Sequence, residues 1–358
     1  MVQSKGINFE GQNIYIGIDV HLHSWHVTVL TSGGYRRKHS QEASSSALFE
    51  HLKRHYPGGR YLAIYESGFS GFSTYYALTS LGIECVIAHA ADIPTGQYEN
   101  VMKTDAVDSE KLARALRDGS LKHTVYVPDR EILDDRGMVR FRKLLQNQLA
   151  GYKSRVKHLL YCNGVSLPAC FANSNTHWSR HFMRWLHEDV RLLSSTRQTL
   201  DLLLEQVERL RVDILEVTRR MRLLSRTERY AARMSLLLSI PGIGLINAIT
   251  LLTELESPDR FHSQRSFAGY LGLVPTCHDS GEKKQHGELT FRGNKRLRVL
   301  MVEGAWVAIR HDAALAAAYG NYRKRMEPQE AIIRIARKLS NRVFRVLKTG
   351  KKYEYERC

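Results

Sequence analysis

The chain has 358 residues, of which 43% are hydrophobic and 25% are charged. This composition is typical of a globular protein and excludes disordered and collagen-like chains, and the length suggests two or three domains. Lys and Arg outnumber Asp and Glu by 53 to 36, which gives a net charge of +17; this excess favours a polyanionic partner such as nucleic acid, although an anionic membrane also attracts basic proteins.

The sequence contains no apolar run near the roughly 18 residues that span a bilayer, and its first residues lack the apolar core of a signal peptide. We therefore expect a cytoplasmic protein with no membrane partner. The five cysteines are widely spaced and include no CxxC pair, so we expect reduced thiols that bind no metal.

The first third of the chain is predicted to be an α/β layer. Residues 14–20 and 26–30 are β-branched, strand-like runs that form a hairpin, and residues 60–67 and 83–90 are two further strands around a helix that stops at Gly82. Residues 125–129 are predicted to be the strand that closes the layer. Two strands followed by strand, helix and strand indicate a mixed α/β fold.

From Met138 the pattern becomes helical, with one apolar and one cationic face up to about residue 161, and residues 163–187 form a helical connector. The cationic face is a candidate nucleic-acid surface. Its residues in this role are Arg140, Arg142, Lys143, Lys153, Arg155 and Lys157.

A heptad pattern follows, with apolar residues spaced alternately by three and four. This spacing predicts a coiled coil that joins two copies of the chain. The alternative is an antiparallel hairpin with the 138–161 helix inside one chain. The seam consists of Leu200, Leu203, Val207, Leu210, Ile214, Val217, Met221 and Leu224.

Residues 236–255 are predicted to be two apolar helices broken by the sequence Pro-Gly-Ile-Gly. In a helix-hairpin-helix, Gly242 and Gly244 would let the backbone approach a phosphate, whereas the alternative is a tight structural turn. The remainder, 259–350, is predicted to be helical, and its high density of cations favours contact with nucleic acid.

Four acidic residues are candidates for a metal site. Asp19 and Glu66 end predicted strands, and Asp105 and Asp108 share one face if their segment is helical. Carboxylates bind Mg²⁺, which assists phosphodiester chemistry. Each acid could instead be a surface residue or a helix cap. We expect His21, His23 and His26 to lie on a turn and the start of a strand rather than to form a transition-metal site.

Ser280 is a candidate nucleophile because a cluster of cations follows it, and cations offset the charge of a phosphodiester under attack. A serine before a glycine is otherwise ordinary turn chemistry. The neighbouring Ser263 and Ser266 are interpreted as structural residues at a helix start. The cations in the candidate nucleic-acid surface here are Lys283, Lys284, Arg292, Lys295, Arg296 and Arg298.

Several of these motifs occur together in one known family. The segments IGIDV, YES and KTDAVDSEKLA contain the four acids, and they are followed by SIPGIGLINAITLLTEL, RSFAGYLGLVP, the Ser280-Gly281 pair, FRGNKRLR and ARKL. In this order the chain resembles the DEDD transposases of the insertion sequence 110 family, which include bridge-RNA-guided recombinases and are related to Piv-type DNA invertases. Only the 163–190 connector lacks such support.

The resemblance implies three regions: a RuvC-like, ribonuclease H-type catalytic domain at 1–130, a helical and coiled-coil region at 131–230, and a helical transposase domain at 231–358. Asp19, Glu66, Asp105 and Asp108 would bind Mg²⁺ (or Mn²⁺), and Ser280 would form a covalent phosphoserine with DNA.

The implied function is the excision and insertion of a mobile element. The implied partners are donor and target double-stranded DNA and a noncoding bridge RNA, with a homodimer that forms a tetramer in synapsis and associates with the nucleoid during recombination.

Two other functions fit the same residues. A metal-dependent, Holliday-junction-type endonuclease would use the four acids to hydrolyse DNA with water and would form no link to the protein. A non-enzymatic scaffold would use the basic surfaces to bind nucleic acid, with the acids as helix caps. Trapping of a covalent adduct separates the first from a recombinase, and metal-dependent cleavage excludes the second.

Overall fold

The computed structural model describes residues 8–94, 104–121, 123–280, 283–290 and 293–355, with only the backbone for 276–288. The chain forms two compact units, residues 1–127 and 128–358. Each unit has its own buried apolar core.

The first unit contains a five-stranded mixed sheet in the order β3-β2-β1-β4-β5. β1 pairs antiparallel with β2 and β2 antiparallel with β3, whereas β1, β4 and β5 run parallel. The sheet agrees with the α/β class that the sequence predicts and is consistent with a ribonuclease H-like domain. The strands are β1 (Asn13–Val20), β2 (Ser24–Thr31), β3 (Arg36–Glu42), β4 (Arg60–Glu66) and β5 (Glu84–Ala88).

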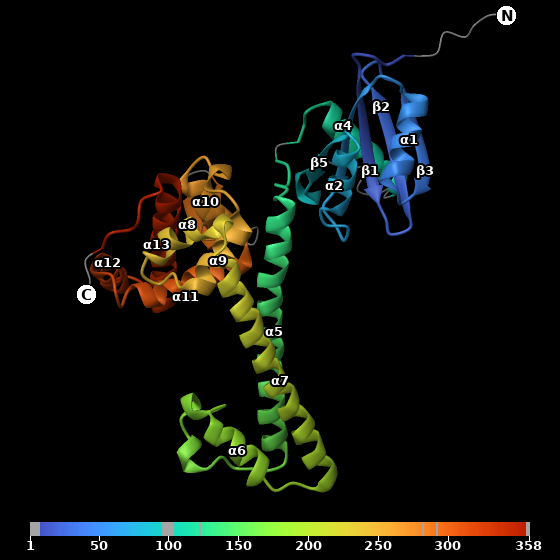
Figure 1. Cartoon of the computed structure of the whole chain (residues 1–358). Helices are drawn as coiled ribbons and strands as arrows, with labels where there is room; N and C mark the ends of the chain where they lie inside the picture. Colours follow the sequence, from blue (N-terminus) through green and yellow to red (C-terminus); the bar gives the residue numbers. More distant parts are fainter. Residues whose placement is uncertain (1–7, 95–103, 122, 281–282, 291–292, 356–358) are drawn as a thin grey trace, which may run out of the picture. The chain divides into compact units, whose positions relative to one another are not determined.

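Helices cover both faces of this sheet (Figure 1). Apolar residues of β1 such as Ile16 pack with Leu48 of α1 (Ser45–His55) and Leu78 of α2 (Ser73–Ser80). The helix α4 (Asp105–Arg117) packs on β1, β2 and β4. It approaches β1 at Gly17, where an added Cβ would lie 2.0 Å from the Ser109 carbonyl oxygen. The short helix η1 (Ala90–Asp92) follows β5.

The sequence prediction missed one strand and one α-helix of the first unit, as well as the short η1, and it placed one strand wrongly. β3 is a polar edge strand with no buried residue, and α1 begins shortly after it. The sequence therefore has no apolar pattern that would indicate the strand or the point at which the helix begins. Residues 125–129 form no strand. Val125 donates one backbone hydrogen bond of 2.8 Å to Ile87, and Pro128, which has no N–H, prevents the ladder from continuing.

In its described residues, the regular structure of the second unit is helical apart from one hairpin. Its longest helices, α5 and α7, run antiparallel and pack together (Figure 1). The α-helices are α5 (Arg130–Cys162), α6 (Arg180–Glu188), α7 (Ser194–Leu224), α8 (Glu228–Leu238), α9 (Leu245–Leu255), α10 (Gln264–Tyr270), α11 (Lys295–Ala308), α12 (Ala313–Arg323) and α13 (Pro328–Thr349), with short helices η2 (Ala169–Phe171), η3 (Ser174–Thr176) and η4 (Pro258–Arg260).

The predicted heptad seam is used inside the chain. Leu200 and Val207 of α7 are buried in one cluster with Val156 and Leu160 of α5, and Leu210 joins a second cluster that includes Leu145. This arrangement is the antiparallel hairpin that the sequence left as an alternative. The seam is therefore largely buried before any second copy is present.

Residues 275–289 correct the prediction of an all-helical C-terminal part. They contain the antiparallel strands β6 (Pro275–Ser280) and β7 (Lys283–Leu289). Pro275 and Gly287 are poor helix formers, and the segment has no apolar stripe at helical spacing, so it has nothing to bury as a helix.

Among the described residues, Cys85, Cys162 and Cys170 are free thiols. Within the same part of the chain, no helix combines the length and the apolar character needed to cross a membrane.

Candidate metal site at the carboxyl end of β1

The sheet directs several predicted residues toward the face that α4 covers. Side chains alternate along a strand, so Asp19 lies on the same face as Gly17, which α4 contacts. Ile64 of β4 packs with Leu112 of α4, and the same alternation places Glu66 on this face. Glu66 ends β4 beside the end of β1, because the two strands are parallel.

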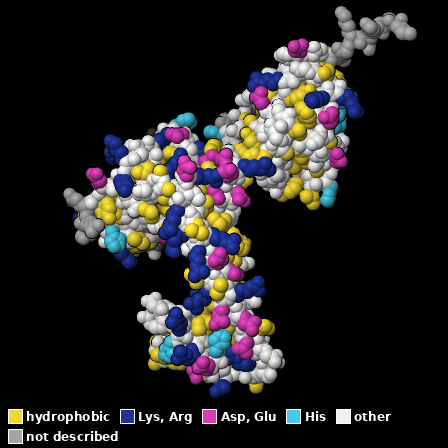
Figure 2. All heavy atoms as spheres, in the orientation of Figure 1, with side chains coloured by type: hydrophobic (Ala, Val, Ile, Leu, Met, Phe, Trp, Pro, Cys, Tyr) yellow, Lys and Arg dark blue, Asp and Glu magenta, His cyan; other side chains and the backbone are white. Residues whose placement is uncertain are grey.

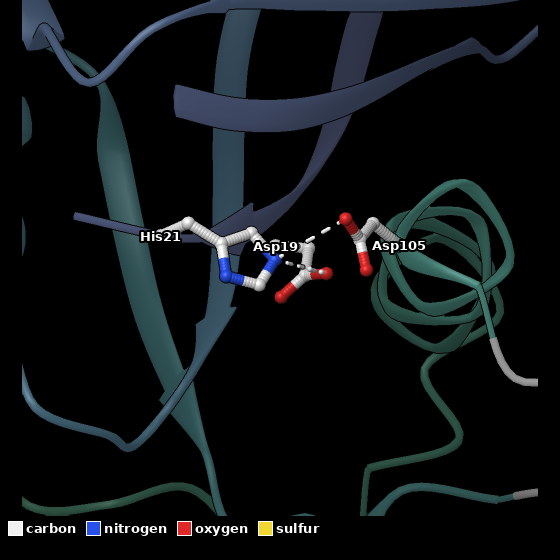
Figure 3. A group of neighbouring side chains, drawn as sticks. All are labelled: Asp19, His21 and Asp105. Carbon is white, nitrogen blue, oxygen red and sulfur yellow. Dashed lines mark hydrogen bonds and ion pairs between the residues drawn. The ribbon is translucent and has the colours of Figure 1, made fainter. Parts of the chain in front are cut away.

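An Asp-His-Asp cluster forms at this point. His21 Nε2 lies 3.2 Å from Asp19 Oδ2 and 3.5 Å from Asp105 Oδ2, and one potential ligand atom from each of the three residues lies within 4.8 Å of the others. Figure 3 shows Asp105 projecting from α4 toward the other two side chains. His26, which pairs with Asp19 across the sheet, has its Nε2 3.2 Å from Asp105 Oδ2.

Two contacts hold α4 in the position that brings Asp105 here. The close approach at Gly17 admits the helix backbone, and buried Thr28 of β2 hydrogen bonds Ser109 at 2.9 Å. Thr104 is the N-cap and its side chain accepts from the Val107 N–H. Asp105 is therefore not the N-cap residue, contrary to the alternative considered from the sequence.

The electrostatics of the cluster favour a bound cation. Burial raises the pKa of Asp19, and the neighbouring Asp105 and Asp108 carboxylates raise it further, while His21 acts in the opposite direction. Asp108 also forms an ion pair of 2.9 Å with Lys111. Carboxylates that repel one another in a partly buried position are stabilised by a positive ion.

The residues present fit a divalent metal. Asp19 and Asp105 offer the oxygen ligands that Mg²⁺ and Mn²⁺ accept, and His21 adds a nitrogen that suits transition metals better than Mg²⁺. Glu66 and Asp108 lie outside the group of three. From the sequence we expect His21 to lie on a turn and to bind no metal; its spacing of two residues from Asp19 is the local signal for its place in the cluster.

Ser280 ends β6 and pairs with Lys283 across the hairpin. The side chains of Ser280, Lys283 and Lys284 lie outside the described atoms, as does Arg292. The interpretation of Ser263 and Ser266 as structural residues is confirmed, since they form a capping box at the start of α10.

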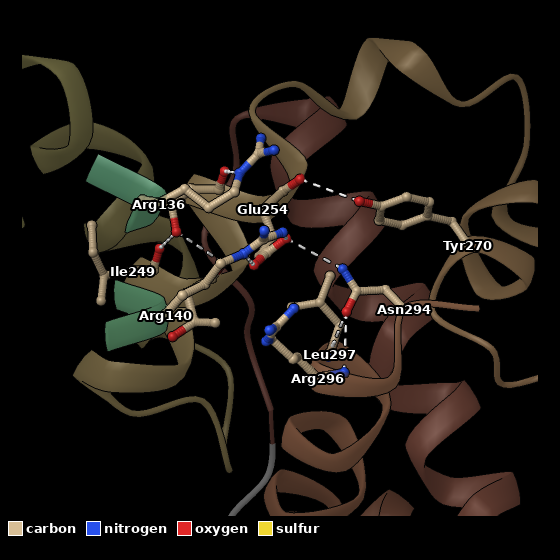
Figure 4. A network of polar contacts seen from close by, with 10 residues as sticks. Arg136, Arg140, Ile249, Glu254, Tyr270, Asn294, Arg296 and Leu297 are labelled. Atoms are coloured by element: carbon tan, nitrogen blue, oxygen red, sulfur yellow. Dashed lines mark hydrogen bonds and ion pairs between the residues drawn. The ribbon is translucent and has the colours of Figure 1, made fainter. Parts of the chain in front are cut away.

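Several predicted nucleic-acid contacts have partners within the second unit. Arg140 forms a bidentate ion pair of 2.7 and 2.9 Å with the buried carboxylate of Glu254, which also accepts a 3.3 Å hydrogen bond from Asn294 (Figure 4). Arg142 donates to the Thr218 hydroxyl at 2.7 Å. Arg298 donates to the Thr290 carbonyl. These arginines stabilise the fold, and a contact with nucleic acid remains a prediction for each.

Two cations of α5 lie over aromatic rings. Lys153 Nζ lies 5.2 Å from the Trp178 ring centre, and the Arg155 guanidinium lies 5.1 Å from that of Tyr152. Lys157 is partly buried. Figure 2 shows Lys and Arg side chains along the long helices interleaved with acidic ones, so these helices carry no uniform cationic stripe on the face in view.

The glycines of the Pro-Gly-Ile-Gly turn have different structural settings. Gly242 has a φ of +87°, and an added Cβ would lie 2.1 Å from the Gly304 carbonyl oxygen of α11. This close contact supports the structural-turn alternative for Gly242. Gly244 precedes α9 as its N-cap and has open space around it. The helix-hairpin-helix role of both glycines remains a prediction.

Comparison with known protein families places this chain among transposases. The model of the Transposase IS116/IS110/IS902 family matches residues 234–320. A second model, which describes the DEDD transposases of IS110, matches residues 16–162. The second match includes Asp19, His21 and Asp105. The chain belongs to the IS110 family of DEDD transposases, in agreement with the resemblance found in the sequence.

Individual proteins that resemble this chain are also named as transposases. The y4qE protein of Sinorhizobium fredii, named as a transposase, is 32% identical over 79% of this chain, which spans 64% of that relative's length. The y4rJ protein of the same organism, also so named, is 29% identical over 94% of this chain and 92% of its own. The transposase for insertion sequence element IS1533 of Leptospira borgpetersenii is 24% identical over 82% of this chain and 85% of its own.

Proposed function

We propose that the protein is a DNA recombinase that cleaves and rejoins DNA to excise and insert a mobile element. The observation that carries this proposal is the convergence of Asp19 and Asp105 at one end of the sheet, inside the region that matches a DEDD transposase. Asp19 lies near the end of a strand and Asp105 at the start of a helix, so only the folded chain brings the two carboxylates together. An acid that served only as a surface residue or a helix cap would not have to lie beside a second acid.

Asp19 and Asp105 would hold Mg²⁺ or Mn²⁺ together with His21, and Glu66 and Asp108 would complete the DEDD tetrad from the same end of the sheet. Bound there, such an ion supplies positive charge that offsets the charge on the phosphodiester. The close contact of α4 with Gly17 holds the helix at a distance from β1 at which Asp105 lies next to Asp19. The electrostatic repulsion around Asp19 supports this assignment.

Ser280 is the proposed nucleophile. Its hydroxyl oxygen would bond to the phosphorus, its proton would pass to a base, and the bond from phosphorus to the leaving sugar oxygen would break as that oxygen takes up a proton. The phosphoserine keeps a phosphodiester bond, so the reverse attack by a DNA hydroxyl can rejoin the strand. The support for Ser280 is its position inside the family-matched segment, residues 234–320, directly before the cationic residues that follow it.

The proposed partners are donor and target DNA and a bridge RNA, in a homodimer that becomes a tetramer in synapsis. The net charge of +17 supports a large nucleic-acid load. We also propose that the protein works in the cytoplasm and associates with the nucleoid during recombination.

Trapping of a covalent protein–DNA adduct tests the proposed chemistry. The full-length protein is incubated with Mg²⁺ and end-labelled DNA that contains the element ends, and the label that stays with denatured protein is measured. We expect an adduct from the wild type and none from Ser280→Ala, with Ser263→Ala as the control that retains it. Cleavage without any adduct would contradict the serine role and favour the hydrolytic endonuclease.

Sequencing of the RNA that copurifies with the protein tests the guided reaction. The protein is purified from cells that carry its whole element. We expect one abundant RNA from the element's flank, with loops complementary to donor and target DNA. A heterogeneous mixture would contradict guidance and assign site choice to the protein itself.

A further inference from the structure

A basic pocket opens in the second unit between α5, α7, α9 and α11. Its volume is about 470 Å³, within the range of about 300–1,000 Å³ that is typical of small-molecule sites. Its cationic lining comes from Arg140, Arg142 and Lys143 of α5 and from Lys295 and Arg296 of α11. These two groups lie more than a hundred residues apart in the sequence, and the fold brings them to one opening.

The five cations differ in what they already bind. Arg140 is paired with Glu254, and Arg142 donates to Thr218. Lys143, Lys295 and Arg296 are exposed and have no carboxylate partner among the described residues. Three cations at the opening are therefore available for an anionic ligand.

The pocket is held in shape by the buried Glu254. Its side chain is 1% exposed, and it accepts hydrogen bonds from Arg140 of α5 and from Asn294, the N-cap of α11. Burial raises the pKa of Glu254, but the hydrogen bonds from Arg140 and Asn294 and the charges of Arg140 and Arg136 outweigh burial, so the pKa is lowered overall and the carboxylate stays charged. This contact fixes the start of α11 next to α5, as Figure 4 shows.

The interior of the pocket has apolar and amide groups in addition to its cations. Val139, Met221, Ile246 and Leu300 contribute apolar lining, and the half-buried Gln146 contributes an amide that can both donate and accept. The lining also includes the amides of Asn147 and Asn247, the hydroxyl of Thr250 and the exposed carboxylate of Glu303. An apolar floor with amides beside it, and a rim of five cations against one exposed carboxylate, matches a nucleotide, which has a flat base with polar edges and an anionic phosphate. A simple phosphate would need only the rim.

We infer that this pocket seats one unpaired nucleotide of a bound nucleic acid. The phosphate contacts Lys143, Lys295 and Arg296, and the base lies against the apolar floor within reach of Gln146. A base inside a duplex cannot enter, so the site selects single-stranded or flipped-out nucleotides. The inference rests on the proposed function and adds to it a nucleic-acid contact remote in sequence from the acidic cluster.

Fluorescence anisotropy with the full-length protein tests the inference, without divalent metal so that cleavage does not contribute. The probes are fluorescein-labelled single-stranded DNA and RNA of the same sequence, about 12 nucleotides long, and the corresponding DNA duplex. We expect the double variant Lys295→Gln/Arg296→Gln to weaken single-strand binding about tenfold relative to the control Lys324→Gln/Arg325→Gln, which removes two exposed cations elsewhere.

The variant Gln146→Leu, which does not change the net charge, distinguishes binding of a base inside the pocket from binding to the cationic surface alone. We expect it to weaken single-strand binding about fivefold, the loss of one hydrogen bond, and to leave duplex binding unchanged. An effect on only the DNA or only the RNA probe identifies the source of the nucleotide. Equal effects of the two double variants, or no effect of Gln146→Leu on either single strand, would overturn the inference.

Asp19→Asn separates this inference from the proposed function. It should retain full binding in this assay, because the acidic cluster is not part of the pocket. If the pocket variants bind single strands as the wild type does while the wild type cleaves DNA, the pocket inference is wrong and the proposed function is unaffected. If cleavage is absent while the pocket variants weaken binding as expected, the proposed function is wrong and the pocket inference is unaffected.

Discussion

Gly17 determines at the level of a single residue whether the acidic cluster can form. An added Cβ would lie 2.0 Å from the Ser109 oxygen and 2.5 Å from the Ala113 nitrogen, both of them backbone atoms of α4. We expect Gly17→Ala to lower the free energy of unfolding by about 3 kcal/mol and to displace Asp105, as denaturant unfolding and metal binding can measure. Gly33→Ala is the control, since its Cβ meets nothing closer than 3.9 Å, and an equal loss in both variants would contradict the packing argument.

His21 contributes the nitrogen of the Asp-His-Asp cluster. Imidazole suits Mn²⁺ better than Mg²⁺, so we expect His21→Ala to weaken Mn²⁺ binding about tenfold and to affect Mg²⁺ binding less. Calorimetric titration of both ions into the wild type and the variant measures the difference. The exposed His23 provides the control variant, His23→Ala. Unchanged Mn²⁺ affinity in His21→Ala would exclude His21 as a ligand.

The packing of α1 on β3 makes the stability of the first unit depend on pH. The rings of His39 and His51 stack at 4.0 Å, and His55 lies 4.5 Å from His51. Burial, as the largest cause, and the charges of His39, His55, Arg37 and Arg54 together lower the pKa of His51 from 6.5 to about 4. The unfolded chain therefore takes up a proton at a pH where folded His51 stays neutral, and stability falls as pH decreases from 6.5 to about 4.

We expect the loss over this pH range to be about 1–2 kcal/mol, less than the full shift implies because solvent reaches part of the ring. Denaturant unfolding at several pH values measures it. His51→Asn should flatten this dependence, and His23→Asn should not. A wild type whose stability is constant over the range would contradict the assignment.

The packing of α7 on α5 separates folding from association. Leu210 is 7% exposed and Leu215 is 60% exposed. We expect Leu210→Ala to lower the free energy of unfolding by about 2–4 kcal/mol and Leu215→Ala to change it by less than about 0.5 kcal/mol. If a homodimer forms through α7, it has to use outward residues such as Leu215, so Leu215→Ala should shift sedimentation equilibrium toward monomer. Dissociation by Leu210→Ala at no cost in stability would contradict this view.

At the scale of the whole molecule, the sequence predicted features that are written in local patterns. The strands that carry Asp19 and Glu66 at or next to their ends are mostly apolar, and the helix that starts at Asp105 has a cap and an apolar stripe. The polar edge strand β3 and the β6–β7 hairpin have no such pattern. The pairing of Arg140 with Glu254 and of His21 with Asp105 depends on contacts between distant segments, which local spacing cannot reveal.

Mg²⁺-dependent cleavage of plasmid DNA that carries the element ends tests the central claim most directly. The wild type is compared with Asp19→Asn and with Asp118→Asn, an exposed acid paired with Arg117. We predict that the wild type and Asp118→Asn cleave with Mg²⁺ and lose cleavage when EDTA removes it, whereas Asp19→Asn binds the DNA but does not cleave it. Cleavage by Asp19→Asn at the wild-type rate, or cleavage that persists in EDTA, would contradict the account.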